Sequence, residues 1–245
     1  NPPFQTGFPG KRNVTVMKKV IVFGNTILSK MLYYDSLSAD NFEVICFTVD
    51  KAYLNQPEFL GRPQVDFDSI TSLYPPGEYD MISILGGYSN MRNREKMYTR
   101  AKEKGYKLRN YISPKADFSP EITLGENNII FGQSHIGIGG VMGNNNIIRQ
   151  NTYLGHDFIM GNHNFIGAGC TIGGNSRMNN TSYIGLGATV INNITMAEET
   201  LIGAGSVVIK NTEPYSKNVG NPSHIIGYHK EEGIKMSVTD GQTYH

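Results

Sequence analysis

A six-residue repeat in the second half of the chain constrains its fold more than any other feature. From Phe118 to Val208, every sixth residue is apolar without interruption. These positions are Phe118, Leu124, Ile130, Ile136, Met142, Ile148, Leu154, Met160, Ile166, Ile172, Met178, Ile184, Val190, Met196, Ile202 and Val208. Neither the helical period nor the strand period produces this spacing. The repeat therefore indicates a solenoid of short stacked units.

Small residues recur at fixed positions within the six-residue repeat. Glycine often follows the apolar residue, and a small or polar residue often stands two places before it. Glycine readily forms the positive-φ corners that other residues avoid. The pattern predicts a parallel β-helix of hexapeptide units, each a short strand and a turn.

The repeat also predicts the dimensions of this β-helix. Three units form one coil of a triangular prism, with the aliphatic side chains on its axis. Coils stack about 4.8 Å apart, so the repeat predicts about five coils and a prism roughly 25 Å tall. The repeat contains no insertion, so we expect no long loop that could cover an acceptor.

The preceding part of the chain has a different pattern. Buried-type strands are expected over residues 18–24, 42–49 and 80–85, with helices over 27–37 and 92–104. This order predicts a small Rossmann-like α/β domain over residues 17–110, followed by a β-helix domain over 111–229. Residues 1–16 are expected to be a tag or a disordered leader, and 230–245 a C-terminal tail.

Ligands of such α/β sheets bind beyond the carboxyl ends of the strands. Those ends carry Gly24, Asn25, Asp50 and Gly86-Gly87-Tyr88 here, and a carboxylate such as Asp50 can accept hydrogen bonds from ribose hydroxyls. The full glycine-rich fingerprint of dinucleotide sites is absent. We expect Gly24, Asn25, Asp50 and Gly86 to contact a nucleotide; alternatively, the glycines only make tight turns.

Whole-chain properties exclude several classes of protein. The net charge is +1, which argues against nucleic acid as a partner. Cys46 and Cys170 form no metal-ligand pattern, so neither a disulfide framework nor a metal site is expected. No apolar run reaches the length of about 20 residues that spans a bilayer, and no signal peptide is visible. We therefore expect a cytoplasmic protein without membrane insertion.

The stretch 151–157, Asn-Thr-Tyr-Leu-Gly-His-Asp, and the block 170–175, Cys-Thr-Ile-Gly-Gly-Asn, narrow the assignment. With an α/β domain before the prism, residues 17–228 resemble the bacterial sugar acetyltransferases of the PglD/NeuD-like group. The resemblance implies a left-handed β-helix, acetyl-CoA as co-substrate, a nucleotide-linked amino sugar as acceptor, and bacterial glycan biosynthesis as the setting. It also implies a homotrimer with active sites between subunits.

The same resemblance assigns roles to particular residues. The family's general base maps to His156, its acidic neighbour to Asp157, and the backbone amide that holds the thioester carbonyl to Gly174. The backbone contacts of its coenzyme A groove map to Leu186 and Ala204. The motif that closes the prism maps to residues 220–222, where Pro222 would lie near the cofactor.

The chemistry suits these residues. An amine attacks the thioester carbonyl, and an imidazole oriented by a carboxylate can take the proton. A backbone N–H can stabilise the oxyanion. No acyl-enzyme is required, so Cys170 is expected in the core. Lys210 either contacts a phosphate of coenzyme A or is a solvated lysine.

The sequence departs from the PglD/NeuD-like pattern at two places, and both concern the acceptor. Some relatives carry a second histidine where this chain has Phe165, and their glycine-rich nucleotide loop is reduced here. His163 could line the same cleft or be a polar face residue, and His135, His224 and His229 are expected on the surface.

Three alternative functions stay open. They are a sugar O-acetyltransferase of the sialic-acid type, a non-catalytic sugar-nucleotide-binding scaffold, and a zinc enzyme whose three histidines would have to converge.

Overall fold

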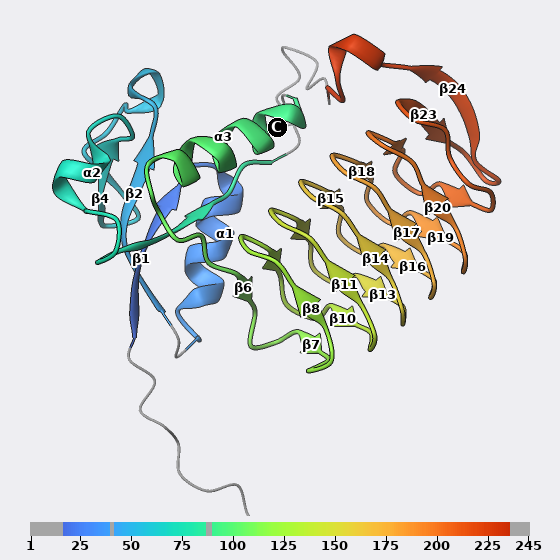
Figure 1. Ribbon diagram of the computed structural model, residues 1–245, viewed down its shortest axis with the longest axis horizontal. Coiled ribbons are helices and arrows are strands. Elements are labelled where there is room, and N and C mark those ends of the chain that lie inside the picture. Colours follow the sequence, from blue (N-terminus) through green and yellow to red (C-terminus); the bar gives the residue numbers. More distant parts are fainter. Residues whose placement is uncertain (1–16, 40–41, 87–89, 236–245) are drawn as a thin grey trace, which may run out of the picture.

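The computed structural model describes residues 17–39, 42–86 and 90–235. The expected leader, part of the expected tail, and Gly87 and Tyr88 lie outside the described residues. Two bodies lie side by side in Figure 1: an α/β sheet with its helices, and a prism of stacked coils. Within the described residues, no helix is long and apolar enough to cross a membrane.

The first body is an α/β sheet in the strand order β3-β4-β2-β1-β5. Strands β4, β2, β1 and β5 run parallel, whereas β3 pairs antiparallel with β4. This parallel order is that of a Rossmann half. Its elements are β1 (Lys18–Phe23), α1 (Ile27–Ser36), β2 (Phe42–Val49), η1 (Lys51–Tyr53), β3 (Glu58–Phe59), β4 (Arg62–Asp66), α2 (Ile70–Leu73), β5 (Asp80–Ser83) and α3 (Arg92–Glu103).

The strands and helices expected in this part are confirmed, with ends that differ by a few residues. The sequence reading missed β3, β4 and α2. Pro57 and Pro63 flank or interrupt the apolar run there, and proline normally argues against a strand. Strand β4 tolerates Pro63 because its pairing with β2 begins only at Gln64, so the missing N–H removes no hydrogen bond from that ladder. Pro63 pairs instead with Glu58 of the two-residue strand β3.

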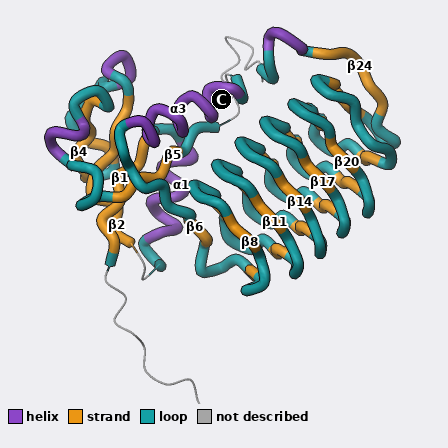
Figure 2. The backbone as a smooth tube through the Cα atoms, viewed as in Figure 1, coloured by secondary structure: helices purple, strands orange, loops and turns teal. Residues whose placement is uncertain are grey.

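The second body is a β-helix of three sheets, here named face A, face B and face C (Figure 2), in which all strands pair in parallel except the last, β24. Face A contains β7 (Asp117–Phe118), β10 (His135–Ile136), β13 (Tyr153–Leu154), β16 (Thr171–Ile172), β19 (Thr189–Val190) and β22 (Val207–Val208). Face B contains β8 (Thr123–Leu124), β11 (Val141–Met142), β14 (Ile159–Met160), β17 (Arg177–Met178) and β20 (Thr195–Met196). Face C contains β6 (Tyr111–Ile112), β9 (Ile129–Ile130), β12 (Ile147–Ile148), β15 (Phe165–Ile166), β18 (Tyr183–Ile184), β21 (Leu201–Ile202), β23 (Ser216–Val219) and β24 (His224–Tyr228).

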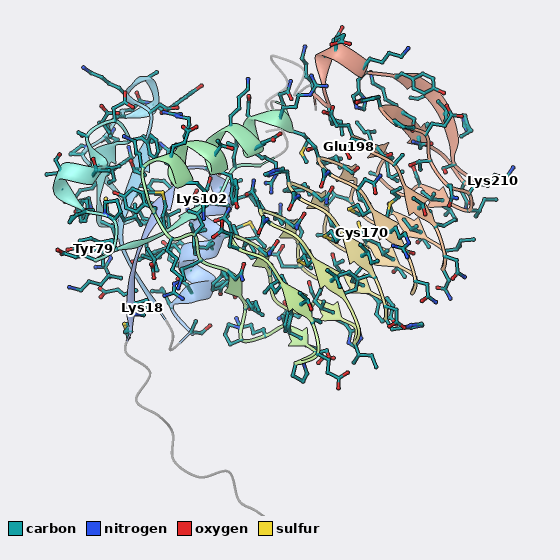
Figure 3. All side chains as sticks on the ribbon, in the orientation of Figure 1. Lys18, Tyr79, Lys102, Cys170, Glu198 and Lys210 are labelled. Atoms are coloured by element: carbon teal, nitrogen blue, oxygen red, sulfur yellow. The ribbon has the colours of Figure 1, made fainter. Side chains whose placement is uncertain are left out.

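The repeat residues fill the axis of the prism as predicted. Those from Ile130 to Val208 are buried in one core, and Phe118 and Leu124 pack against its open end. Cys170 is fully buried in the same core, and Figure 3 places it within the coils. The prediction of a core cysteine is confirmed.

The two bodies share a second core across face C. The outward side chains of its successive coils are buried: Tyr111, Ile129, Ile147, Phe165 and Tyr183. They belong to one apolar cluster with sheet and helix residues of the first body, such as Val20 and Leu32. Face C is therefore covered by the α/β body, whereas faces A and B are open in the single chain.

Helix α3 and the C-terminal segment close the joint between the bodies. The buried Arg94 of α3 donates hydrogen bonds to the backbone carbonyl of Asn145 (2.7 Å), to that of His163 (3.3 Å) and to that of Leu85. After the antiparallel hairpin β23–β24, η2 (Lys230–Glu232) leads the chain back to α3. There the Met91 N–H donates to the Ile234 carbonyl over 2.9 Å.

Candidate active site

A histidine and an aspartate meet at the corner where face A turns into face B. His156 and Asp157 follow β13, and Asp157 adopts a positive φ of 53° at the corner. The Nδ1 atom of His156 lies 2.8 Å from Oδ2 of Asp157. Both side chains are more than half exposed, at 53% and 60%. The carboxylate therefore orients the ring and leaves Nε2 available for a substrate.

Gly174 lies one coil beyond His156 on the same corner. A β-carbon at position 174 would stand 2.5 Å from Nε2 of His156. Only glycine lets the imidazole lie flat against the next coil in this position. The structure thus brings together the three residues expected to be catalytic.

The corners of the prism differ in whether their backbone N–H groups have a hydrogen-bond acceptor. At the corner between faces B and C, an asparagine ladder accepts them: Asn144 N–H donates to Asn162 Oδ1, and Asn162 N–H to Asn180 Oδ1, each over 2.7 Å. At the other two corners, the N–H groups of Gly174, Leu186 and Ala204 have no acceptor among the described residues. These donors are available to a ligand.

The residues expected along the cofactor groove are distributed over two edges of face A. Leu186 and Ala204 are exposed on successive coils of the corner between faces C and A. Lys210 is exposed on the His156 corner, two coils beyond Gly174, and Figure 3 shows it at the far edge of the prism. Pro222 lies in the turn between β23 and β24, after a cis peptide bond.

Face A carries two shallow hollows that meet at Tyr153. One, of about 390 Å³, includes His156 and the outward residues of the earlier coils, Asp117 and His135. The other, of about 550 Å³, extends over the later coils and includes Thr171, Thr189 and Asn192. Tyr153 lines both hollows.

Sequence reasoning missed the partners of His135. Its Nδ1 atom lies 2.7 Å from Oδ2 of Asp117, and its ring stacks on Tyr153 with centroids 5.0 Å apart. Asp117, His135 and Tyr153 occupy the same place in successive coils. The stacking of residues one coil apart was the signal that could have revealed this group.

The α/β body contains a larger cavity of about 570 Å³ at the carboxyl ends of β1, β2 and β5. All four residues expected to bind a nucleotide, Gly24, Asn25, Asp50 and Gly86, line it. Gly24 has a φ of 137°, and a β-carbon there would stand 2.5 Å from the Ile84 carbonyl oxygen. Glycine at this position allows the close approach of β1 to β5.

Two of the three charged residues that line this cavity, Asp50 and Arg100, are paired with each other, and the third is Lys96. Arg100 of α3 donates from its two terminal nitrogens to the Asp50 carboxylate over 3.0 and 2.6 Å. Both side chains remain about 40% exposed, at 38% and 39%. Asp50 is thus held in place by a guanidinium at the wall of the cavity. Sequence reasoning missed Arg100, which lies far away in the chain.

Unlike His135, His163 and His229 do not line the hollow that contains His156. His163 packs under α3, where Asn145 donates to its Nδ1 over 2.8 Å. Burial, together with the nearby Arg94, lowers the pKa of His163 to about 4. His229 is buried, at 5% exposure, so its expected surface position is wrong. Among residues 17–39, 42–86 and 90–235, no group of acidic, histidine and cysteine side chains could hold a metal ion.

Together these features define a hexapeptide-repeat β-helix preceded by a Rossmann-like sheet, with a histidine–aspartate pair on an open corner. No protein-family model matches the sequence, and no curated protein does. Solved structures share the fold. The acetyltransferase domain of PglB from Neisseria gonorrhoeae, in complex with acetyl coenzyme A, has a TM-score of 0.79 and 23% identity; the match covers 86% of this chain and 100% of that chain.

Two further structures extend the comparison. A perosamine N-acetyltransferase variant from Caulobacter crescentus, in complex with CoA and GDP-perosamine, has a TM-score of 0.78 and 23% identity over 88% of this chain and 100% of that one. WeeI from Acinetobacter baumannii has a TM-score of 0.73 and 18% identity over 86% of this chain and 100% of that one. These similarities show that the α/β body and the β-helix form a recurring two-part fold.

Proposed function

We propose that this chain is an acetyl-CoA-dependent N-acetyltransferase whose acceptor is a nucleotide-linked amino sugar. The observation that carries the proposal is the His156–Asp157 pair, which lies against Gly174 on an open corner of the prism. The shared fold supports it, because the PglB domain binds acetyl coenzyme A and the perosamine enzyme binds CoA and GDP-perosamine. Acetyl-CoA and nucleotide sugars are cytoplasmic metabolites, so we place the reaction in the cytoplasm.

In this proposal His156 acts as the general base. The acceptor amine attacks the thioester carbonyl, and Nε2 of His156 takes a proton from the nitrogen as it becomes cationic. Asp157 fixes the ring and stabilises the imidazolium. The Gly174 N–H donates to the tetrahedral oxyanion, which collapses and expels the coenzyme A thiolate. The imidazolium can return its proton to that thiolate.

The donor would lie along the later coils of face A. The hollow beyond Tyr153 extends over the later coils as far as Asn193. The open N–H groups of Leu186 and Ala204 suit the amide carbonyls of the pantetheine chain. Lys210 would contact a phosphate at the far end, and Pro222 would border the same end.

The acceptor's nucleotide would occupy the cavity of the α/β body, with Gly24, Asn25, Asp50 and Gly86 around it. We take the α/β body as residues 17–110 and the β-helix as residues 111–229. The α/β body covers face C, whereas His156 lies on the corner of the β-helix opposite to that face. One chain therefore cannot bring its own cavity to its own His156. If the threefold axis of an oligomer runs parallel to the prism axis, equivalent coils of neighbouring subunits lie at the same level along that axis. A homotrimer of this kind would place a neighbour's cavity beside His156.

Calorimetry and an acceptor panel test this function. Acetyl-CoA and coenzyme A are titrated into the full chain, and transfer is measured to GDP-, UDP- and dTDP-linked 4-amino-4,6-dideoxyhexoses and to free sialic acid. We expect micromolar donor binding and transfer to an amino sugar. His156→Ala should lower kcat by about 100-fold or more with donor affinity retained. Absence of donor binding, or an unchanged kcat in the variant, would contradict the proposal.

A further inference from the structure

A second imidazole–carboxylate pair lies in the same hollow as His156. Asp117 and His135 belong to the neighbouring strands β7 and β10 of face A, and both line the hollow of about 390 Å³ with His156. The side chain of His135 is 45% exposed and that of Asp117 is 79% exposed. A ligand in this hollow can therefore reach both histidines.

The two pairs are built alike. In each, a carboxylate oxygen lies within 2.8 Å of Nδ1: 2.7 Å in His135–Asp117 and 2.8 Å in His156–Asp157. The Nε2 atom of each ring has no protein partner among the described residues. A carboxylate at Nδ1 places the proton there in the neutral ring and leaves Nε2 as a proton acceptor. Both rings are thus prepared to take a proton from a ligand.

Tyr153 connects the second pair to the site of transfer. Its ring stacks on that of His135 with an interplanar angle of 7°. The same tyrosine lies on the border between the two hollows of face A. The stack holds the His135 ring in one orientation, at the edge of the hollow that would receive the acceptor.

We propose that His135, held by Asp117 and Tyr153, is the residue that receives the acceptor amine and takes its first proton. This inference rests on the proposed function and adds a second proton acceptor to it. It also selects the acceptor class, because an amine and a hydroxyl need different numbers of proton acceptors.

An amine acceptor must lose two protons during the transfer. An alkyl amine is an ammonium ion near pH 7, because its pKa lies above that pH. The ammonium gives one proton to Nε2 of His135, which later passes it to solvent. The free amine then attacks the thioester carbon, and the resulting cationic nitrogen gives its second proton to His156. As the C–S bond breaks, the thiolate takes that proton and leaves as coenzyme A.

A hydroxyl acceptor loses only one proton, so His156 alone would be sufficient for it. The presence of two oriented imidazoles in one hollow therefore favours an amine. The charged or titratable groups that face His135 are Asp117 from β7, Tyr153 from β13 and His156 from the corner. The other residues around the hollow are Phe118, Ser119, Pro120, Ile136, Gly137 and Ile138.

The pH profile of kcat/KM tests the inference. GDP- and UDP-linked 4-amino-4,6-dideoxyhexoses are the probes, with the full-length wild type, His135→Ala, His135→Gln and Asp117→Asn. The wild type should have a nearly constant kcat/KM for the amine between pH 7 and 9. Both His135 variants should be about 10- to 100-fold lower at pH 7, because only the small free-amine fraction reacts, and should approach the wild type near pH 9.5. Asp117→Asn should show a smaller loss of the same kind.

A control variant and two further measurements show whether a lower kcat/KM is specific to His135. Glu121→Gln removes an exposed charge near the hollow without lining it and should match the wild type at every pH. Donor binding by calorimetry and the melting temperature should be unchanged in all variants. His135 profiles that run parallel to that of the wild type would overturn the role of His135 and leave the proposed function standing. A wild type that transfers to none of the amino sugars would overturn the proposed function and this inference with it.

Discussion

At the scale of single residues, the contact between Gly174 and His156 makes the sharpest prediction. Alanine at position 174 keeps the backbone N–H, but its β-carbon would meet Nε2 of His156 at 2.5 Å. The ring must then turn away, and a displacement of about 1 Å can cost up to 100-fold in rate. We expect Gly174→Ala to lower kcat by about 10- to 100-fold, with a melting temperature close to that of the wild type.

The double variant Gly174→Ala/His156→Ala shows whether the loss passes through the histidine. If it does, the double variant will be no slower than His156→Ala alone, because the ring that the new methyl group displaces is already absent. Independent losses that add in free energy would instead mean that Gly174 acts on the substrate directly.

At the scale of elements, the packing of α3 on the β-helix predicts acid sensitivity. Burial, helped by the positive Arg94, lowers the pKa of His163 to about 4, below the value of about 6.5 in an unfolded chain. Between these pH values the unfolded chain binds more protons, so the free energy of unfolding falls as the pH drops from about 6.5 to 4. The loss from this group can reach about 3 kcal/mol.

The variant His163→Asn isolates this effect. His163 has a positive φ of 63°, which asparagine tolerates, and Asn145 occupies the same place one coil earlier. Urea unfolding at pH 7, 5.5 and 4.5, at one protein concentration, should show a weaker pH dependence for the variant. An identical dependence in both proteins would show that other groups cause the acid loss.

The elements also show what the sequence can and cannot reveal. The prism core was predictable because each coil repeats the same inward position, so residues such as Ile166 and Met196 could be assigned without tertiary information. The strand β4 was not predicted, because it contains Pro63 and the strands that pair with it, β2 and β3, cannot be identified from its own sequence. The corner with His156 and Asp157 was predicted from a motif, and the 18-residue spacing of Asp117 and His135 could have revealed that pair as well. Asp50 and Arg100, in contrast, are brought together only by the fold.

At the scale of the whole molecule, the arrangement of the two bodies predicts shared active sites. The cavity proposed to bind the nucleotide belongs to the body on face C, and His156 belongs to the corner between faces A and B. If one chain supplies the cavity and its neighbour supplies the histidine, two inactive variants with different defects can rescue each other. His156→Ala lacks the base, and Asp50→Asn together with Asn25→Ala would disable the cavity while Gly24, which the packing of β1 on β5 requires, is kept.

Refolding an equal mixture of these two chains tests the shared site. About three quarters of the trimers would be mixed, and each mixed trimer would have one intact site out of three, which gives about a quarter of the wild-type activity. Each variant refolded alone should be nearly inactive. The mixture would also remain inactive if every site were built within one chain, and this would contradict the proposed assembly. Activity near a quarter would locate the reaction between neighbouring subunits.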